Sequence, residues 1–175
     1  MVFLDSPDMD DDHRRVMLRE PTYLRAVADA PNVVNCIDVE QDDKQMVLVL
    51  EYLAGGQLLD HLHELGGQGL YTEQHAAQLF VQVVQGVKAL HDANILHRDI
   101  KGENVLYARP RVAEKEKQIG DGKPPRVVLI DLGMGVQYDA AAPHRGAMGS
   151  PGFVAPEVAL GGVLYICIDV IVFMT

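Results

Sequence analysis

Eight consecutive residues, His97 to Asn104 (HRDIKGEN), place a carboxylate, an ammonium group and an amide close together in the chain. The carboxylate of Asp99 can accept a proton from a hydroxyl group within hydrogen-bond reach. The amide oxygen of Asn104 is a hard, neutral ligand that suits magnesium. Lys101 can offer a positive charge to a phosphoryl group. These types at this spacing predict chemistry on a hydroxyl group, with a divalent cation and an anionic partner.

Two further motifs follow in the chain. Asp131-Leu132-Gly133 comes directly after an apolar run at residues 127–130, and its carboxylate would add a charged magnesium ligand. The stretch GSPGFVAPE, from Gly149 to Glu157, precedes a nearly continuous apolar segment that contains Asp169. A three-residue motif alone is weak, but its place after a predicted strand corroborates the first motif.

The three motifs occur in the order found in protein kinases: His-Arg-Asp, then Asp-Leu-Gly, then Ala-Pro-Glu. The chain therefore resembles a eukaryotic-type Ser/Thr protein kinase domain from about Glu20 to Asp169. Lys101, two residues after Asp99, is typical of Ser/Thr rather than Tyr kinases. The stretches LVLEYLAGGQLLDHL and ILHRDIKGENVLY are most similar to the calcium/calmodulin-dependent and calcium-dependent kinase group.

The resemblance implies ATP and Mg²⁺ as cofactors and a protein substrate with a Ser or Thr hydroxyl. It makes Asp99, Lys101 and Asn104 the catalytic residues. Asn104 and Asp131 would hold the magnesium ion. Calcium or calmodulin is a possible further partner, although no calcium-binding loop of the helix–loop–helix type is visible in the sequence.

The resemblance also assigns a nucleotide site. Leu50 would be the gatekeeper behind the adenine. The backbone of Glu51 and Leu53 would bind the adenine edge, Gln57 would lie near the ribose, and Leu106 would support the adenine from below.

Other positions receive structural or regulatory roles: Glu20, His97, Arg98, Leu132, Gly133, Ser150, Glu157 and Asp169. Glu20 would pair with the lysine that anchors the phosphates, Glu157 would anchor the activation segment, and Ser150 would face the substrate. A hydrophobic spine ending on Asp169 would contain Leu24, Cys36, Leu132 and His97.

The chain departs from the kinase pattern before Glu20. The glycine-rich loop and the strand with the ATP-anchoring lysine are expected there, yet no lysine precedes Lys44. The chain also stops six residues after Asp169. The sequence therefore predicts a kinase fragment that is inactive or nearly inactive in isolation. A pseudokinase-like binding module is the alternative, and a membrane-tethered protein is a third possibility.

The activation segment lacks the usual phosphorylation sites. Between Asp131 and Gly149 there is no Ser or Thr, only Tyr138. Arg98 meets a phosphorylated side chain in kinases of this kind, and Asp139 is the candidate for a substitute charge. We therefore expect that activity does not require Ser/Thr phosphorylation of this segment.

The periodicity of apolar residues predicts the elements that position these motifs. Helices are expected at 12–30, 57–65 and 72–91, with Pro21 bending or restarting the first. Strands are expected at 33–39, 46–50, 105–107 and 127–130, a surface loop at 108–125, and irregular chain from 131 to 154. The fold class is α+β, a kinase-like two-lobed fold that is incomplete at both ends. Residues 1–53 would belong to the N-lobe and residues 54–175 to the C-lobe.

Composition restricts the partners. The formal net charge of −10 argues against nucleic acid and anionic membranes, because both select an excess of Lys and Arg. Two cysteines in apolar surroundings fit a reduced, cytoplasmic setting. The apolar run at 158–174 is short for a membrane span and contains Asp169, so a buried helix is the favoured interpretation.

Overall fold

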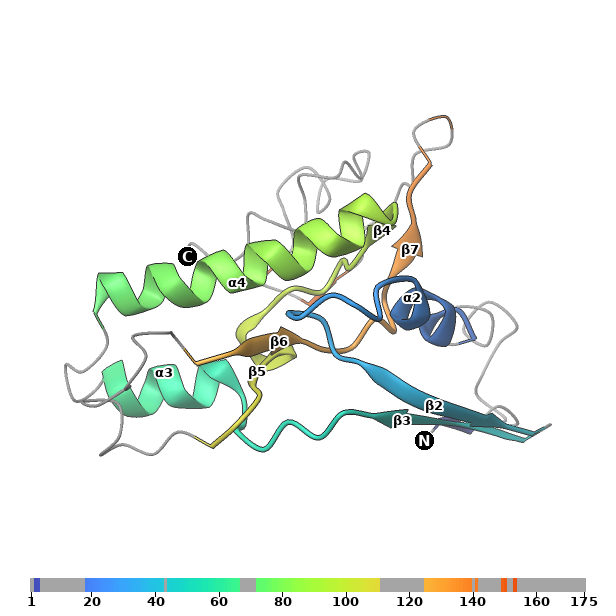
Figure 1. Cartoon of the computed structure of the whole chain (residues 1–175), viewed down its shortest axis with the longest axis horizontal. Coiled ribbons are helices and arrows are strands. Elements are labelled where there is room, and N and C mark those ends of the chain that lie inside the picture. The colour runs from blue at the N-terminus through green and yellow to red at the C-terminus, as the bar shows by residue number, and fades with distance from the viewer. Residues whose placement is uncertain are drawn as a thin grey trace.

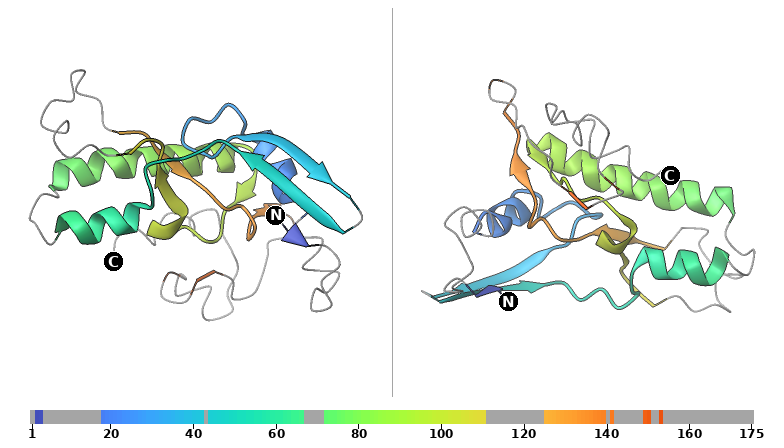
Figure 2. Two further views of the ribbon diagram at one scale, coloured as in Figure 1. Left: turned by 90° about the horizontal axis from the view of Figure 1, so that it is seen from below. Right: turned by 180° about the vertical axis from the view of Figure 1, so that it is seen from behind.

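The computed structural model describes residues 2–3, 18–42, 44–66, 72–110, 125–139, 141, 149–150 and 153. Helices and strands are mixed along the chain. The long helix α4 and the shorter α3 lie on one side of the molecule, and a β-hairpin projects away from them with α2 beside it (Figure 1). Two small sheets lie between these parts (Figures 1 and 2).

Helix α2 (Glu20–Ala26) has a proline near its start. Pro21 occupies the first turn, where its missing N–H costs nothing, because the first amides of a helix have no partner within the helix. The predicted helix at 12–30 is therefore too long within the described residues: residues 18–19 and 27–29 form turns. Tyr23 and Leu24 are buried and attach α2 to the core.

The hairpin β2 (Cys36–Gln41) and β3 (Gln45–Leu50) confirms the two predicted strands with shifted bounds. Its turn is held by the Asp42 carboxylate, which accepts hydrogen bonds from the amides of Lys44 and Gln45, both at 2.8 Å. These bonds lower the pKa of Asp42. Strand β1 (Val2–Phe3) pairs antiparallel with β3, so the sheet order is β1-β3-β2.

The two predicted helices after the hairpin are confirmed. Helix α3 spans Leu58–Gly66 and helix α4 spans Glu73–Asp92. Thr72 caps α4, since its hydroxyl accepts a hydrogen bond from the His75 amide at 3.2 Å. The buried face of α4 packs against strand β6 (Val127–Leu129).

Three strands were missed: β1, described above, and a further pair, each of two residues. Strand β4 (Ile95–Leu96) pairs with β7 (Val136–Gln137), so the prediction of irregular chain from 131 to 154 is wrong at β7. Each of these strands has only two residues, too few for an alternating apolar pattern to show in the sequence. Strand β5 (Val105–Tyr107) pairs with β6, in agreement with the expected strands.

The core joins these elements through the segment before β2. The Val34 amide donates to the Leu129 carbonyl and the Leu129 amide donates to the Asn32 carbonyl, both at 2.9 Å. Buried Asn32 also donates to the Val127 carbonyl at 2.7 Å and to Gln82 on α4 at 3.2 Å. Because its Nδ2 has two acceptors, the burial of this donor avoids the usual penalty.

Several expectations fall on residues outside the described part of the chain. These are the start of the predicted first helix, most of the loop at 108–125, Glu157, Asp169 and the apolar run at 158–174. Among the helices that the structure describes, none has the length and apolar character needed to cross a membrane.

Candidate active site

Two chain segments run antiparallel and hold the site between them. One passes from β4 through residues 97–104 to β5, and the other passes from β6 through residues 130–135 to β7. Because β5 pairs with β6 and β4 pairs with β7, the two intervening loops must lie side by side. The Ile130 amide donates to the Asn104 carbonyl at 3.0 Å between these loops. The HRDIKGEN and Asp-Leu-Gly motifs therefore meet in space.

Asp99 is the best-connected side chain of the site. It is 8% exposed, and its carboxylate accepts four hydrogen bonds. The Ser150 hydroxyl (2.7 Å) and amide (3.1 Å) donate to Oδ1, while Lys101 (2.8 Å) and Asn104 (3.1 Å) donate to Oδ2. Burial by itself raises the pKa of Asp99, but the bonds from Lys101 and Ser150 outweigh it and lower this pKa below its ordinary value. Asp99 is thus held as a fixed carboxylate.

Lys101 links Asp99 to Ser150. Its ammonium group donates to Asp99 at 2.8 Å and to the Ser150 hydroxyl at 2.6 Å. The hydrogen bond to Asp99 raises the pKa of Lys101, and the negative charges of Glu103 and Asp131 act in the same direction. Lys101 stays charged at neutral pH and can meet an anionic group beside Asp99.

The orientation of the Asn104 amide is fixed by its donors. Its Nδ2 donates to both the backbone carbonyl (2.8 Å) and the carboxylate (3.1 Å) of Asp99. Its Oδ1 accepts no hydrogen bond from any described residue. The amide oxygen is therefore the atom left for an external ligand such as a hard cation.

His97 and Arg98 connect the loop at residues 97–104 to the loop at residues 130–135. The Asp99 amide donates to Nδ1 of the buried His97 ring at 3.2 Å, so the proton on this ring sits on Nε2, which donates to the Ile130 carbonyl at 3.1 Å. Arg98 has a positive φ of 69° and donates through Nε to the Met134 carbonyl at 2.6 Å. A non-glycine residue in this region stores about 1–3 kcal/mol of strain, which the surrounding contacts must hold.

The Asp131-Leu132-Gly133 motif has a similar strained residue. Asp131 has a φ of 65°, and its exposed carboxylate accepts a hydrogen bond from the Gly133 amide at 3.1 Å. Leu132 is buried, and it belongs to the same core cluster as Leu24, with Cys36 packed against it. Three of the expected spine members, Leu24, Cys36 and Leu132, therefore lie in or against one cluster. His97 is buried and bonds to the carbonyl of Ile130, two residues before Leu132, whereas Asp169 is outside the described residues.

Glu20 on α2 reaches this motif. Its carboxylate accepts a hydrogen bond from the Leu132 amide at 3.1 Å. Burial raises the pKa of Glu20, the nearby Asp131 charge raises it further, and the Leu132 amide opposes the shift. In the part of the chain that the structure describes, no Lys or Arg forms an ion pair with Glu20. The lysine that was expected to pair with Glu20 is therefore not found among the described residues.

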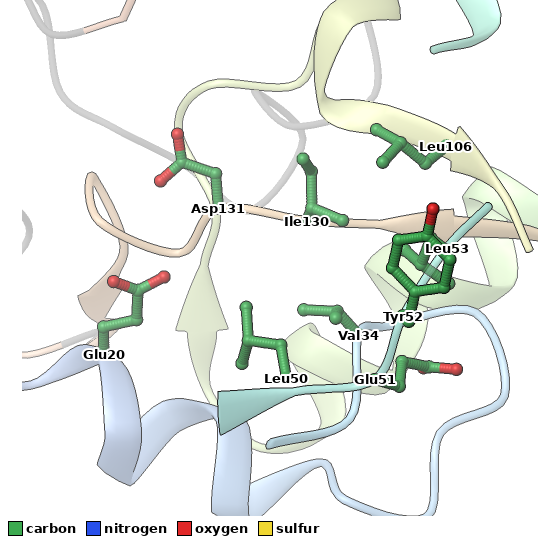
Figure 3. Close-up of a pocket in the computed structure, with 9 residues that line it drawn as sticks. All are labelled: Glu20, Val34, Leu50, Glu51, Tyr52, Leu53, Leu106, Ile130 and Asp131. Carbon is green, nitrogen blue, oxygen red and sulfur yellow. The ribbon is translucent and has the colours of Figure 1, made fainter. Parts of the chain in front are cut away.

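A cavity of about 400 Å³ opens beside these carboxylates. Nine residues line it: Glu20, Val34, Leu50, Glu51, Tyr52, Leu53, Leu106, Ile130 and Asp131. Figure 3 shows Glu20 and Asp131 toward one end of the pocket and Tyr52, Leu53 and Leu106 toward the other. An apolar cavity of this size with a few polar groups at one end is typical of small-molecule sites.

This cavity is lined by most of the residues that were expected to bind the nucleotide. Leu50, Glu51, Leu53, Leu106 and Asp131 do so, and the Leu53 N–H and C=O make no hydrogen bond within the described residues. Gln57 does not line the cavity, although it forms a β-bridge with Leu106.

Four residues that line the cavity or contact its lining were not predicted from the sequence: Val34, Tyr52, Ile130 and Arg126. Tyr52 lies between two predicted hinge residues, and Ile130 precedes Asp131, so their positions carried a signal. Val34 has no signal beyond its place in a predicted strand. Arg126 pairs with Glu51 across 75 positions, which no local pattern reveals.

The structure does not show the suggested pairing of Arg98 with Asp139 among the described residues. The Asp139 carboxylate accepts a hydrogen bond from the Ala141 amide at 2.8 Å, which leaves lone pairs for a second partner. Of the other predicted positions, Ser150 lies on Asp99 as described, whereas Glu157 and Asp169 are outside the described residues.

The described residues contain no group of three or more His, Cys, Asp or Glu side chains that could hold a metal ion. Mg²⁺ does not need such a cage, because it is commonly held by one or two protein oxygens together with phosphates and water. The free Oδ1 of Asn104 and the exposed carboxylate of Asp131 fit that type of ligand set.

Comparison with known proteins agrees with this geometry. The family model described as protein kinase domain matches residues 3–168. The chain is 34% identical over 73% of its length to "Calcium/calmodulin-dependent protein kinase type 1" of Macrobrachium nipponense, and 37% identical over 79% to the type 1B kinase of Rattus norvegicus. It is 32% identical over 82% to "Calcium and calcium/calmodulin-dependent serine/threonine-protein kinase" of Pisum sativum.

The aligned part covers 33%, 36% and 27% of these three relatives, so the chain spans about a third of their length. The matched region contains all the contacts of Asp99 and every residue that lines the cavity. The chain belongs to the protein kinase domain family, with the α+β fold of that family, and the relatives it matches are kinases of the calcium/calmodulin-dependent Ser/Thr group.

Proposed function

We propose that the protein transfers the γ-phosphoryl group of ATP to Ser or Thr hydroxyls of a protein substrate. The observation that carries this proposal is the setting of Asp99: a lowered pKa, an ammonium group on one oxygen, and the free amide oxygen of Asn104 beside it. The adjacent cavity ends at Asp131 and has the size of a nucleoside site.

The geometry supports a direct transfer. Asp99 accepts the proton of the substrate hydroxyl, the hydroxyl oxygen forms a bond to the γ-phosphorus, and the bond from that phosphorus to the β–γ bridging oxygen breaks, which releases ADP. Lys101 stabilises the negative charge of the transferred group. Asn104 and Asp131 would hold Mg²⁺, which would supply charge neutralisation on the phosphates.

The free backbone groups of Leu53 support adenine binding at the far end of the cavity. A donor and an acceptor that make no hydrogen bond among the described residues can pair with the edge of a base, while the apolar side chain of Leu106 can contact its face and Leu50 can lie behind it. We also propose that the boundary between an N-lobe and a C-lobe falls between residues 53 and 54, so that the nucleotide binds at the junction.

A pseudokinase-like binding module is the second candidate. Glu20 and Asp131 carry charges of the same sign near one another, and residues 1–43 contain no lysine that could lie between them. Without that cation the phosphates would be poorly positioned, and positioning contributes most of the rate enhancement in phosphoryl transfer. We infer that the 175-residue chain by itself is inactive or nearly inactive.

Phosphoryl transfer separates these candidates. The full-length protein, assayed with Mg²⁺–ATP and Ser- and Thr-containing peptides, should phosphorylate them, and Asp99→Asn should lower kcat by about 10²–10⁴-fold. Nucleotide binding by a correctly folded full-length protein without any transfer would favour the binding module. Transfer by the isolated 175-residue chain that is lost in Asp99→Asn would overturn its proposed inactivity.

Control by calcium and calmodulin is a separate proposal, supported by the names of the similar kinases. Adding Ca²⁺-loaded calmodulin to the full-length protein should change its transfer rate, and a chelator should reverse the change. An unchanged rate would contradict the regulation and leave the transferase proposal intact.

A further inference from the structure

Arg126 connects three separate parts of the chain. Its Nη1 and Nη2 donate to the two carboxylate oxygens of Glu51, each at 3.0 Å, and its Nε donates to the Pro31 carbonyl at 2.6 Å. The Arg126 carbonyl accepts from the Ala108 amide at 3.0 Å, which fixes its backbone beside the β5–β6 pair. All three guanidinium nitrogens are used, so the side chain is restricted to one geometry.

Glu51 is held from a second side as well. Its carboxylate accepts from the Asn35 amide at 3.0 Å, and its own amide donates to the Asn35 carbonyl at 2.9 Å. The hydrogen bond from Arg126 lowers the pKa of Glu51, which agrees with a stable ion pair. The Glu51 carbonyl, by contrast, accepts no hydrogen bond within the described residues. The carboxylate and the amide of Glu51 therefore have hydrogen-bond partners within the protein, whereas its carbonyl beside the cavity has none among the described residues.

The segment that bears these free groups has no regular structure of its own. Residues 51–57 connect β3 to α3 without a helix or an extended strand ladder. Such a segment loses conformational freedom when a ligand orders it, and a contact that fixes it beforehand lowers that cost. The Glu51–Arg126 ion pair is a contact of this kind, placed one residue from Tyr52 and two from Leu53.

We propose that Arg126 is a positioning residue for the nucleotide, which acts through its bidentate ion pair with Glu51 to fix the backbone of residues 51–53 against the adenine. This inference rests on the proposed nucleotide site and names the residue that holds its base-binding edge in place. Arg126 itself does not line the cavity.

The size of the effect is limited by the ion pair itself. A contact that only pre-organises a segment can contribute to binding no more than its own coupling energy. The side chains of Arg126 and Glu51 are 41% and 22% exposed, so the pair is partly screened by solvent. Loss of the pair should weaken nucleotide binding roughly twofold to fivefold, the range expected for a partly exposed pair.

The experiment measures binding of adenosine and of Mg²⁺–ATP to the full-length protein and to Arg126→Gln, Glu51→Gln and the double variant. Adenosine has no charge, so long-range electrostatics hardly affect it. Both single variants should raise the Kd of adenosine to a similar extent, and the double variant should be no worse than either, because the two residues act as one unit.

The affinity for ATP then distinguishes positioning of the backbone from a purely electrostatic attraction of the phosphates. If Arg126 only attracts the phosphates, Arg126→Gln weakens ATP binding whereas Glu51→Gln strengthens it, and neither changes the affinity for adenosine. If the pair positions the backbone, both variants weaken both ligands. In the transferase assay the KM for ATP should rise while kcat changes little, because the pair lies at the adenine end of the site.

Arg109→Gln is the matched control, since it removes the same charge from an exposed arginine that pairs with no described residue. The Kd of adenosine for Arg126→Lys should lie between those of wild type and Arg126→Gln, because lysine cannot donate a bidentate pair. If Arg126→Gln fails to fold, Glu51→Gln and Arg126→Lys are the variants that test the inference. Wild-type affinities for adenosine in correctly folded Glu51→Gln and Arg126→Lys would overturn the inference. A wild-type protein that binds no nucleotide would instead contradict the proposed function and, with it, this inference.

Discussion

Asp99 shows how single residues define the chemistry of the site. Four donors surround its carboxylate, and they come from Lys101, Asn104 and Ser150. Ser150 lies 51 positions along the chain, yet it supplies two of these donors. The protonation state of Asp99 therefore depends on the activation segment as well as on its own loop.

Replacing Ser150 by Ala should change the pH dependence of activity. The variant loses the hydroxyl donor to Asp99, so the lowered pKa of this carboxyl should rise toward its ordinary value. The active form is the carboxylate, and the acidic limb of the pH profile of kcat/KM should therefore move to higher pH. Activity should also fall about 10- to 100-fold, because a hydrogen bond to a charged group contributes about 1.5–3 kcal/mol.

Ser150→Thr is the matched variant, because it keeps the hydroxyl and should keep the wild-type profile. The stability change has a defined sign: a carboxyl with a lowered pKa stabilises the fold above its unfolded pKa, and this contribution disappears as the pH falls through the folded pKa. Ser150→Ala should therefore lose stability at neutral pH and little at low pH. An acidic limb that stays in place would refute the role of Ser150.

Helix α4 shows how an element supports the site at a distance. Its buried Gly86 lies against the loop before β2, where an added Cβ would be 2.6 Å from the Asn32 carbonyl oxygen and 2.9 Å from Leu129. The same Asn32 carbonyl accepts the Leu129 amide, and β6 leads directly to Asp131. A close helix–loop approach therefore determines the position of a proposed magnesium ligand.

Gly86→Ala should destabilise the fold even though alanine is the better helix former. Alanine gains about 1 kcal/mol of helix propensity over glycine, but forcing a methyl group into this contact costs about 1–3 kcal/mol. The denaturation midpoint should fall, and activity should fall with it because β6 must shift. Gln85→Ala, at an exposed position of the same helix, should be neutral or stabilising, and a similar gain for Gly86→Ala would show that the contact is loose.

At the scale of the whole molecule, the cavity is lined by residues from several separate segments of the described chain. Its lining comes from α2, the segment before β2, the end of β3, the connection to α3, β5 and the residues after β6. A ligand bound there contacts all of these at once. Binding to the folded state alone should therefore stabilise the entire fold.

Filling the cavity should abolish that stabilisation. Nucleotide at 100 times its Kd should stabilise the wild-type protein by about 2.7 kcal/mol. Leu106→Trp places a larger side chain into the cavity from a half-buried position, so the unfolding temperature should no longer respond to nucleotide. Val81→Trp, at a 53% exposed position on α4 that does not line the cavity, should keep the wild-type response. A full response in Leu106→Trp would place the nucleotide elsewhere.

The sequence by itself determined the local parts. The helical period of apolar residues predicted α4, and short apolar runs bounded by polar or turn residues predicted the hairpin and the β5–β6 strands. The proline lies in the first turn of α2, and the helix is shorter than expected because residues 18–19 and 27–29 form turns. The motifs around Asp99 and Asp131 identified the candidate site, because their residue types and spacing are specific.

Only the tertiary structure decided how these parts meet. The two-residue strands β4 and β7 are too short to leave a pattern, yet their pairing sets the two loops side by side. The bonds of Ser150 to Asp99 and of Arg126 to Glu51 span 51 and 75 positions. The suggested pairing of Asp139 with Arg98 is not seen among the described residues, where Asp139 bonds to the Ala141 amide. Sequence patterns report the neighbours of a residue along the chain, whereas these contacts depend on how distant segments pack, and packing is a property of the whole fold.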